Sequence, residues 1–316
     1  MIHRKLRLFS GTSNPPLAQA ISEAIGTPLG DISIRRFSDG EIYLQYGETI
    51  RGKDVFFIQP TSALANTNLM ELLIAIDAAK RASARQICAV TPYFGYARQD
   101  RKSSGRTPIT AKLVADMIEV AGATRVLTMD LHAGQIQGFF NIPVDNIYAA
   151  PLFARDIQEH NALDRVTIVS PDVGGVVRAR ALAKRLHVDM AIVDKRRPAP
   201  NEAEVMNIIG DVDGKHCILV DDMVDTAGTL CNAAQALVER GASKVTAYAT
   251  HGVLSGPAAD RLETTDALHE LVITDTILQP ERILQLGKVR VLSAAPLLAE
   301  TISRIYDARS ISSLYN

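Results

Sequence analysis

Short runs of apolar, often β-branched residues alternate with longer amphipathic stretches through most of the chain. Apolar runs of this length predict β-strands, and the amphipathic stretches between many of them predict helices. The predicted strands are Leu6–Phe9, Val55–Ile58, Ile87–Val90, Val126–Met129, Val166–Val169, Ala191–Val193, Ile218–Val220 and Val245–Ala249. The predicted helices include Leu69–Arg81, Ala111–Glu119, Val176–Arg185 and Ala233–Glu239. This alternation predicts an α/β fold with mainly parallel sheets flanked by helices, and the lack of polar alternation within the strands predicts burial of both sheet faces.

Parts of the two halves of the chain resemble each other in layout. Gly52–Leu69 and Gly214–Leu230 each begin with Gly-Lys and continue through an apolar strand and a loop with Thr into a predicted helix. Leu8–Gly26 and Ile168–Leu186 form a second pair at nearly the same offset. A duplicated domain explains both pairs, although any two βαβ units share part of this rhythm.

The length of 316 residues fits two domains of about 150 residues each, which we expect over residues 1–148 and 149–316 with the break near Tyr148–Pro151. The balance of 34 Lys and Arg against 35 Asp and Glu leaves a net charge of -1, which argues against general nucleic-acid or membrane-surface binding. No export signal or membrane-spanning run is visible, and the three cysteines are scattered. We therefore expect a cytoplasmic protein with reduced thiols and with no nucleic-acid or membrane partner.

The two halves differ in chemistry at one aligned position. Asp221 and Asp222 follow the predicted strand of the second half, whereas Gln59 and Pro60 follow the corresponding strand of the first half. Paired carboxylates can accept hydrogen bonds from a sugar diol or help to place Mg²⁺. The second half is therefore the better candidate for sugar-phosphate binding.

The segment Ile218–Thr229 continues from these carboxylates through Asp225-Thr226-Ala227-Gly228-Thr229 into a helical run. Gly228 lets the backbone turn closely, and the hydroxyls and amides at a helix start present donors to an anion. Phosphate donors a few residues beyond diol acceptors match a pentose 5-phosphate, bound at the carboxyl end of a parallel strand. The alternative is a turn in which Asp and Thr only cap the helix.

The segment Ile218–Thr229 resembles the phosphoribosyl diphosphate (PRPP) motif of type I phosphoribosyltransferase-fold proteins, a superfamily that includes the ribose-phosphate diphosphokinases. Further segments resemble that enzyme family along essentially the whole chain. They are Phe37–Glu41, Tyr96–Lys102, Thr128–His132, Gln135–Phe140, Ser170–Gly175 and Thr250–Gly252. The resemblance implies two similar phosphoribosyltransferase-like domains, with ATP and oligomer contacts in the first and the ribose 5-phosphate loop and a catalytic flap in the second.

The same resemblance implies a Mg²⁺-dependent activity. The β,γ-diphosphoryl group of ATP would pass to the anomeric hydroxyl of ribose 5-phosphate, giving PRPP and AMP for nucleotide, histidine and tryptophan biosynthesis. It also implies a homohexamer whose subunit contacts bind an activating phosphate or an inhibiting ADP.

Roles for individual residues are implied by the resemblance as well. The ribose 5-phosphate contacts would be Arg197, Asp221, Asp222, Asp225, Thr226, Ala227, Gly228 and Thr229. The ATP contacts would be Phe37, which stacks on adenine, with Ser38, Asp39, Glu41, Arg98, Gln99 and Arg101. His132 and Asp172 would contact Mg²⁺, and Lys195 and Arg197 would form the catalytic pair. The regulatory contacts would include Thr49, where the family commonly has Ser, with Arg51, Ser310 and Ser312.

From the residues alone, other interpretations stay open at several of these positions. Phe37 could be a half-buried ring, and the basic run that starts at Arg98 could be a solvated surface. His132 and Asp172 lack the spacing of a metal signature. The stretch Lys195–Pro200 could likewise be a surface loop.

Two rival functions make different demands on the sequence. A nucleobase phosphoribosyltransferase would need only one copy of the domain plus a base-binding hood, and it would not explain Phe37–Glu41 or Arg98–Arg101. A non-catalytic regulatory subunit would be expected to have lost the flap or metal positions, yet Lys195 and His132 are present. A P-loop kinase is excluded because the chain has no GxxxxGK[ST] motif.

Overall fold

The computed structural model describes residues 5–196 and 205–315, with only the backbone described at 195, 196 and 205. The strands are β1 Leu6–Ser10, β2 Ile32–Arg36, β3 Ile42–Tyr46, β4 Asp54–Ile58, β5 Gln86–Thr91, β6 Arg125–Met129, β7 Val144–Ile147, β8 Val166–Ser170, β9 Asp189–Arg196, β10 Val205–Ile209, β11 His216–Val224, β12 Lys244–Gly252, β13 Glu270–Thr274 and β14 Val289–Leu292. The helices are α1 Pro15–Ile25, α2 Ala65–Arg81, α3 Thr110–Ala121, α4 Ala150–His160, α5 Val176–Leu186, α6 Gly228–Glu239, α7 Ala258–Thr264, α8 Glu281–Leu284 and α9 Ala295–Tyr306, with 3₁₀ turns η1 Gly134–Phe139, η2 Leu163–Arg165 and η3 Ser312–Leu314. Each strand and helix predicted above is observed.

The chain forms two compact units. The first contains residues 1–148, 276–278 and 293–316, and the second contains residues 149–275 and 279–292. This division shares the break after Tyr148 with the expected domains, but it differs at the C-terminal end. The last segment of the chain packs with the first unit because α9 lies against α1.

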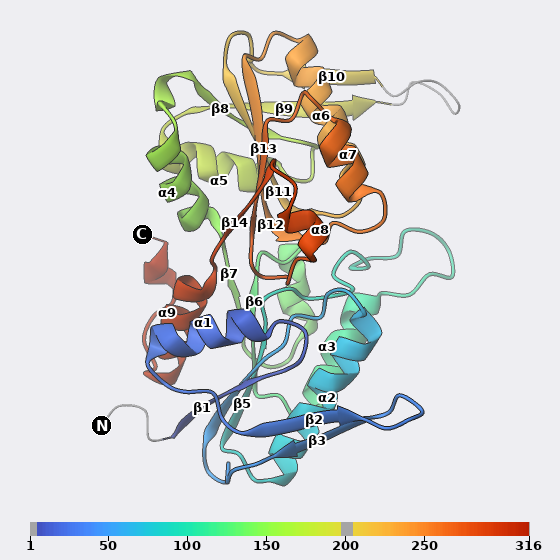
Figure 1. Cartoon of the computed structure of the whole chain (residues 1–316), viewed down its shortest axis with the longest axis vertical. Helices are drawn as coiled ribbons and strands as arrows, with labels where there is room; N and C mark the ends of the chain where they lie inside the picture. The colour runs from blue at the N-terminus through green and yellow to red at the C-terminus, as the bar shows by residue number, and fades with distance from the viewer. Residues whose placement is uncertain (1–4, 197–204, 316) are drawn as a thin grey trace. The chain divides into compact units, whose positions relative to one another are not determined.

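The first unit is built on five parallel strands in the order β1-β4-β5-β6-β7. Helices α2 and α3 lie on one side of this sheet, and α1 with α9 lies on the other (Figure 1). Every residue of the interior strand β4 is buried, as the apolar run Val55–Ile58 predicts for a strand covered on both faces. Strands β2 and β3 form a separate antiparallel hairpin that packs on α2.

The second unit has a seven-stranded sheet in the order β10-β9-β8-β11-β12-β13-β14. All neighbouring strands run parallel except β10, which pairs antiparallel to β9. Helices α4 and α5 lie on one side, and α6 and α7 lie on the other (Figure 1). The sheets are therefore mainly parallel and flanked by helices, as predicted.

The two units share a strand order and a pairing register. Leu8 of β1 stands opposite Phe56 of β4 in the first unit, and Ile168 of β8 stands opposite Ile218 of β11 in the second. These are the partners that the two aligned sequence pairs place at equivalent positions. The agreement between sequence offset and strand register supports two similar domains.

Each unit also carries the helix that follows the last strand of the other. Helix α4 comes directly after β7 of the first unit but packs on α5 of the second. Helix α9 follows β14 of the second unit but packs on α1 of the first. Because α1 and α5 are equivalent helices, the exchange is reciprocal.

Local sequence signals fix the ends of α1. The side chain of Asn14 accepts a hydrogen bond from the amide of Leu17 at 3.3 Å, and Pro15 starts the helix where no amide donor is needed. Gly26 ends the helix in a left-handed conformation with a φ of 72°. The apolar positions Leu17 and Ile21 then point into the core.

A buried ionic network fastens α4 to the second unit. Asp156 of α4 accepts two hydrogen bonds from Arg290 at 2.6 and 2.8 Å and one from the hydroxyl of Tyr248 at 2.6 Å. Arg290 also donates to Glu270 at 2.9 Å. Burial opposes ionisation of Asp156, but the hydrogen bonds from Arg290 and Tyr248 outweigh it and lower the pKa of this carboxyl. The hydrogen bonds from Arg290 and Tyr248 thus stabilise the buried carboxylate of Asp156 in its ionised form.

Removing this carboxylate is expected to destabilise the protein strongly. Asp156→Ala leaves the guanidinium of Arg290 in a half-buried site without its main partner, which should lower the free energy of unfolding by about 3 kcal/mol. Urea denaturation followed by circular dichroism measures the change. Glu159→Ala, an exposed position on the same helix, is the matched control. Equal effects of the two variants would contradict a special role for the network.

Candidate active site

The carboxyl end of β11 carries the predicted carboxylate pair. β8 pairs with β11 only as far as Leu219, whereas β12 follows it to Val224, so β11 extends past one of its neighbours. Asp221 and Asp222 lie on this extension. The side chain of Asp221 is 24% exposed and that of Asp222 is 6% exposed, so neither carboxylate is fully hydrated.

The charge of this pair is partly offset by a cation from α5. Nη1 of Arg178 lies 3.5 Å from Oδ1 of Asp221 and 3.5 Å from Oδ1 of Asp222. Burial raises the pKa of Asp221 above its ordinary value, the adjacent Asp222 charge raises it further, and Arg178 opposes both effects. The edge of the sheet thus holds two acceptor groups whose ionisation depends on their surroundings.

The turn after β11 is held by the two segments beside it. The amide of Ser255 donates to the carbonyl of Asp225 at 3.0 Å, and the hydroxyl of Ser255 donates to the carboxylate of the same residue. Arg261 of α7 donates from Nη1 to the carbonyl of Thr226 at 2.9 Å. A Cβ at Gly228 would lie 2.9 Å from Nη1 of Arg261, so a larger residue there would push this guanidinium away from the turn.

Helix α6 begins in this turn and presents its amide donors there. Ala227 precedes it with a φ of 60°, and the amide of Cys231 makes the first helical bond, to Ala227. The amides of Gly228 and Thr229 have no acceptor within the helix. A helix start of this kind binds anions through these amides and the positive end of the helix dipole. The predicted phosphate-binding residues therefore lie together, directly beyond the carboxylate pair.

Asp172 lies at the same edge, after the neighbouring strand β8. Its Oδ1 accepts from the amide of Gly175 at 2.9 Å, and its carbonyl accepts from the hydroxyl of Ser170 at 2.7 Å. These bonds fix the turn that leads into α5. Oδ2 of Asp172 makes no hydrogen bond among the described residues, so a carboxylate oxygen is available to a ligand at this edge.

His132 belongs to the first unit, where it follows β6 and is exposed. The preceding Asp130 has a φ of 42°, and its amide donates to the carbonyl of Ile147 at 2.8 Å. The amide of Leu131 donates to the side chain of Asn146 at 3.1 Å. Strand β7 therefore holds the segment that presents His132. No cluster of three or more His, Cys, Asp or Glu side chains suited to a metal ion occurs among residues 5–194 and 206–315.

The first group of predicted ATP contacts lies at the tip of the β2–β3 hairpin. Phe37 is 52% exposed, and its ring meets that of Tyr43 edge to face with 6.1 Å between centroids. The guanidinium of Arg35 covers the ring of Tyr43 at 4.3 Å. The neighbouring polar positions Ser38, Asp39 and Glu41 are also exposed. The tip thus offers an aromatic face flanked by acceptors.

The second group follows β5 and lies apart from the hairpin tip (Figure 1). Arg98 and Arg101 are exposed in this loop. Gln99 has a structural role at its base, because its carbonyl accepts from the amide of Ala111 at 3.1 Å and its side chain accepts from the hydroxyl of Thr110. The structure does not bring the two groups of predicted ATP contacts together on one chain.

Comparison with known proteins identifies the family of this chain. The model of the N-terminal domain of ribose phosphate pyrophosphokinase matches residues 6–122, and that of the phosphoribosyl synthetase-associated domain matches residues 193–316. A ribose-phosphate pyrophosphokinase of Rhizobium meliloti is 60% identical over 98% of this chain and 100% of its own length. The chain belongs to the ribose-phosphate pyrophosphokinase family. The enzyme of the same name from Burkholderia pseudomallei is 60% identical over 99% of this chain and 98% of its own length.

A solved structure of the family has the same fold. The phosphoribosylpyrophosphate synthetase of Mycobacterium smegmatis superposes with a TM-score of 0.91 at 43% identity, covering 96% of this chain and 100% of that one. The family resemblance drawn from the sequence is therefore confirmed, together with the fold class. The names of these relatives do not test the roles of individual residues.

The expected catalytic pair falls at the limit of the described structure. Lys195 lies in β9, where its backbone pairs with that of Met206 and its side chain lies outside the described part. Arg197 lies outside the described residues. Both assignments stay predictions of the family resemblance.

The expected regulatory residues lie at two places in the first unit. Thr49 and Arg51 are exposed between β3 and β4. Near the C-terminus the hydroxyls of Ser310 and Ser312 lie 2.8 Å apart, and Arg304 donates to the carbonyl of Ser310 at 2.7 Å. The C-terminal hydroxyls are therefore preorganised beside a cation, but their binding of phosphate or ADP stays a prediction.

Arg178, Ser255 and Arg261 are parts of the site that sequence reasoning missed. Each is distant in sequence from the segment it supports, Arg178 by 43 residues from Asp221. No sequence motif marks these three residues. The one signal concerns Arg178, which is charged where the aligned residue of the first half, Ala18, is apolar.

Neutralising Asp221 is expected to stabilise the free protein at high pH. Because the pKa of Asp221 is raised to about 8, the folded state holds its proton where the unfolded state has lost it, so stability falls as the pH rises from about 4 to about 8. Asp221→Asn should therefore raise the free energy of unfolding at pH 8.5 by about 1 kcal/mol or more, since one pKa unit corresponds to about 1.4 kcal/mol, and leave it nearly unchanged at pH 4. Urea unfolding at both pH values measures this.

The control for this prediction is Asp189→Asn, which neutralises an exposed carboxylate of the same unit. It should leave the pH dependence unchanged. A lower stability of Asp221→Asn at pH 8.5 would contradict the electrostatic description of the pair.

Proposed function

We propose that this protein is a ribose-phosphate diphosphokinase, which transfers the β,γ-diphosphoryl group of ATP to ribose 5-phosphate and releases PRPP and AMP. One observation carries the proposal beyond the family name. The carboxylates of Asp221 and Asp222 and the amides at the start of α6 lie consecutively at one sheet edge. This order matches the diol and the 5-phosphate of a phosphorylated pentose.

In the proposed complex the sugar is held from both ends. The 2- and 3-hydroxyls donate hydrogen bonds to Asp221 and Asp222, and the 5-phosphate accepts from the amides and hydroxyls of residues 226–229. The anomeric hydroxyl is then the group of the sugar that is left to react. Its oxygen bonds to the β-phosphorus of ATP and releases its proton to solvent, while the bond from that phosphorus to the α-phosphate bridging oxygen breaks and the electron pair leaves with AMP.

Positioning and charge neutralisation account for the catalysis in this proposal. Phe37 stacks on the adenine, the acceptors beside it bind the nucleotide, and Arg98 and Arg101 neutralise the polyphosphate. Lys195 and Arg197 bring positive charge to the transferring group. Holding both substrates in place supplies a large part of the barrier reduction without a nucleophilic side chain.

Magnesium is the proposed cofactor. Oxygen ligands are what Mg²⁺ prefers, and Oδ2 of Asp172 is a suitable donor at the edge where the sugar would bind. His132 is the second candidate ligand, from the first unit. When bound near Asp172, Mg²⁺ would supply positive charge to offset the negative charge of the polyphosphate.

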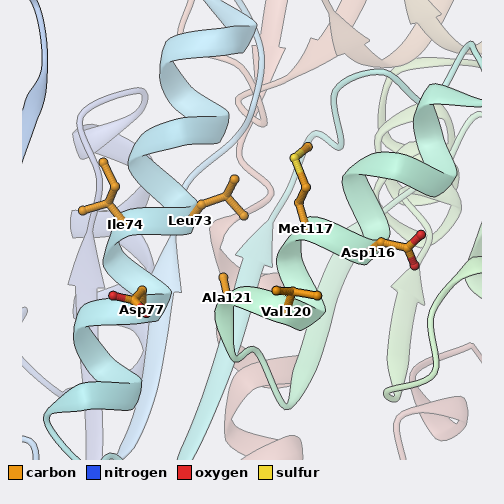
Figure 2. Close-up of a pocket in the computed structure, with 7 residues that line it drawn as sticks. All are labelled: Leu73, Ile74, Asp77, Asp116, Met117, Val120 and Ala121. Carbon is orange, nitrogen blue, oxygen red and sulfur yellow. The ribbon is translucent and has the colours of Figure 1, made fainter.

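Self-association, with a homohexamer as the proposed state, follows from the same resemblance. The tip of the β2–β3 hairpin and the loop after β5 lie apart on one chain, so a nucleotide held by both would be shared between two chains (Figure 1). An apolar surface of the first unit also favours contact between chains. Leu73 and Met117 face each other across a hollow of about 510 Å³ between α2 and α3, with exposed Val120 beside them (Figure 2).

A cytoplasmic location is proposed as well. Cys88, Cys217 and Cys231 are buried and carry no disulfide, which suits a reducing compartment. Within residues 5–196 and 205–315, no helix combines the length and the apolar character that a membrane crossing requires.

Transfer of a labelled phosphate tests the proposal. Purified protein is incubated with Mg²⁺, ribose 5-phosphate and ATP that carries ³²P in the β-phosphate, and the products are separated. The label is expected to move to the sugar while AMP forms in equal amount. ADP as the sole nucleotide product would contradict the proposal, because it would mean transfer of the γ-phosphate alone. Omitting ribose 5-phosphate is the control and should give no AMP.

A further inference from the structure

The two units offer an internal comparison at the edge where the sugar would bind. The shared register of β1–β4 and β8–β11 makes Gln59 and Pro60 equivalent to Asp221 and Asp222. By the alignment of α1 with α5, the position equivalent to Arg178 is Ala18, which is fully buried. The carboxylate pair and the arginine are therefore present together in the second unit and absent together from the first.

The first unit satisfies its equivalent edge with hydrogen bonds from neutral groups. Glu71 of α2 is fully buried there and accepts from the amide and the hydroxyl of Thr12, both at 2.7 Å, and from Nε2 of Gln59 at 2.9 Å. A Cβ at Gly11 would lie 2.1 Å from Oε1 of Gln59, so this edge is filled by its own side chains. It has no carboxylate pair whose charge a cation at position 18 would balance.

The second unit carries its carboxylate pair at this edge and balances the charge of the pair with a cation. Nη1 of Arg178 stands 3.5 Å from one oxygen of each carboxylate, and the side chain is only 21% exposed. At that distance the guanidinium acts mainly through its charge, because a strong charge-assisted hydrogen bond would be shorter. The carboxylates can then accept hydrogen bonds from a diol while the charge of Arg178 remains beside them.

We propose that Arg178 is a positioning residue for ribose 5-phosphate: its guanidinium holds Asp221 and Asp222 side by side in the geometry that accepts the sugar diol. This inference rests on the proposed function for the identity of the sugar. Without the cation, ionisation of the buried pair is more costly, so one carboxyl group keeps its proton and loses an acceptor for the diol. The affinity for the sugar then falls, whereas the binding of ATP, which Arg178 does not serve, is retained.

Steady-state kinetics on three variants test the role of Arg178. Arg178→Gln removes the charge, Arg178→Lys keeps it, and Arg180→Gln removes an exposed charge from the same helix as a matched control. Arg178→Gln is expected to raise KM for ribose 5-phosphate at least tenfold and to change KM for ATP less than twofold. Arg178→Lys should recover most of the loss, and Arg180→Gln should behave like the wild type.

Two results would overturn the proposal. One is an unchanged KM for ribose 5-phosphate in Arg178→Gln. The other is an equal loss in both KM values and in kcat, which would indicate a general structural role. Both are read only against a wild type that forms PRPP. A wild type without that activity would refute the proposed function itself, so the two failures are distinguishable.

A double variant keeps the test decisive if Arg178→Gln alone does not fold. Asp222→Asn halves the charge that Arg178 balances, so Arg178→Gln combined with Asp222→Asn is expected to fold. Calorimetric titration should then show that it binds ribose 5-phosphate within threefold of Asp222→Asn alone. A double variant that remains unfolded, or that binds at least tenfold more weakly than Asp222→Asn, would contradict a role exerted through the carboxylate pair.

Discussion

Two adjacent carboxyl groups at the end of a buried strand are costly to ionise together. The groups that surround them in the second unit offset this cost. Asp221 and Asp222 are too poorly hydrated for water alone to stabilise both charges. Arg178 supplies a nearby cation from α5, and the start of α6 places the positive end of a helix dipole a few residues further along. The result is a surface with acceptors at one end and anion-binding amides at the other, which is the pattern of a sugar phosphate.

The first unit shows how the equivalent edge of the fold is built without the carboxylate pair. The first unit keeps the strand order and register, but Gln59 and Glu71 fill its edge with internal hydrogen bonds. The predicted ATP contacts of this unit lie instead on its exposed β2–β3 hairpin and in the loop after β5. Helix α4 follows β7 but packs in the second unit, and helix α9 follows β14 but packs in the first.

The sequence was sufficient for the elements with strong local signals. Buried, mainly apolar strands such as β4 and β8, and the turn after β11 with its helix start, follow from neighbouring residues and were predicted. The partners of that turn were not, because Arg178 and Arg261 reach it only once the order of strands and helices is set. The packing of α9 on α1 was missed for the same reason, since chain order alone assigns α9 to the second half.

The most direct measurement counts sugar sites, because the account places a ribose 5-phosphate site in only one of two similar units. Calorimetric titration of the purified protein with ribose 5-phosphate should give one site per chain. That site should disappear when Asp221 and Asp222 are both replaced by Asn, in a protein whose circular dichroism is unchanged. Two sites per chain, or one site that survives the double replacement, would contradict the account.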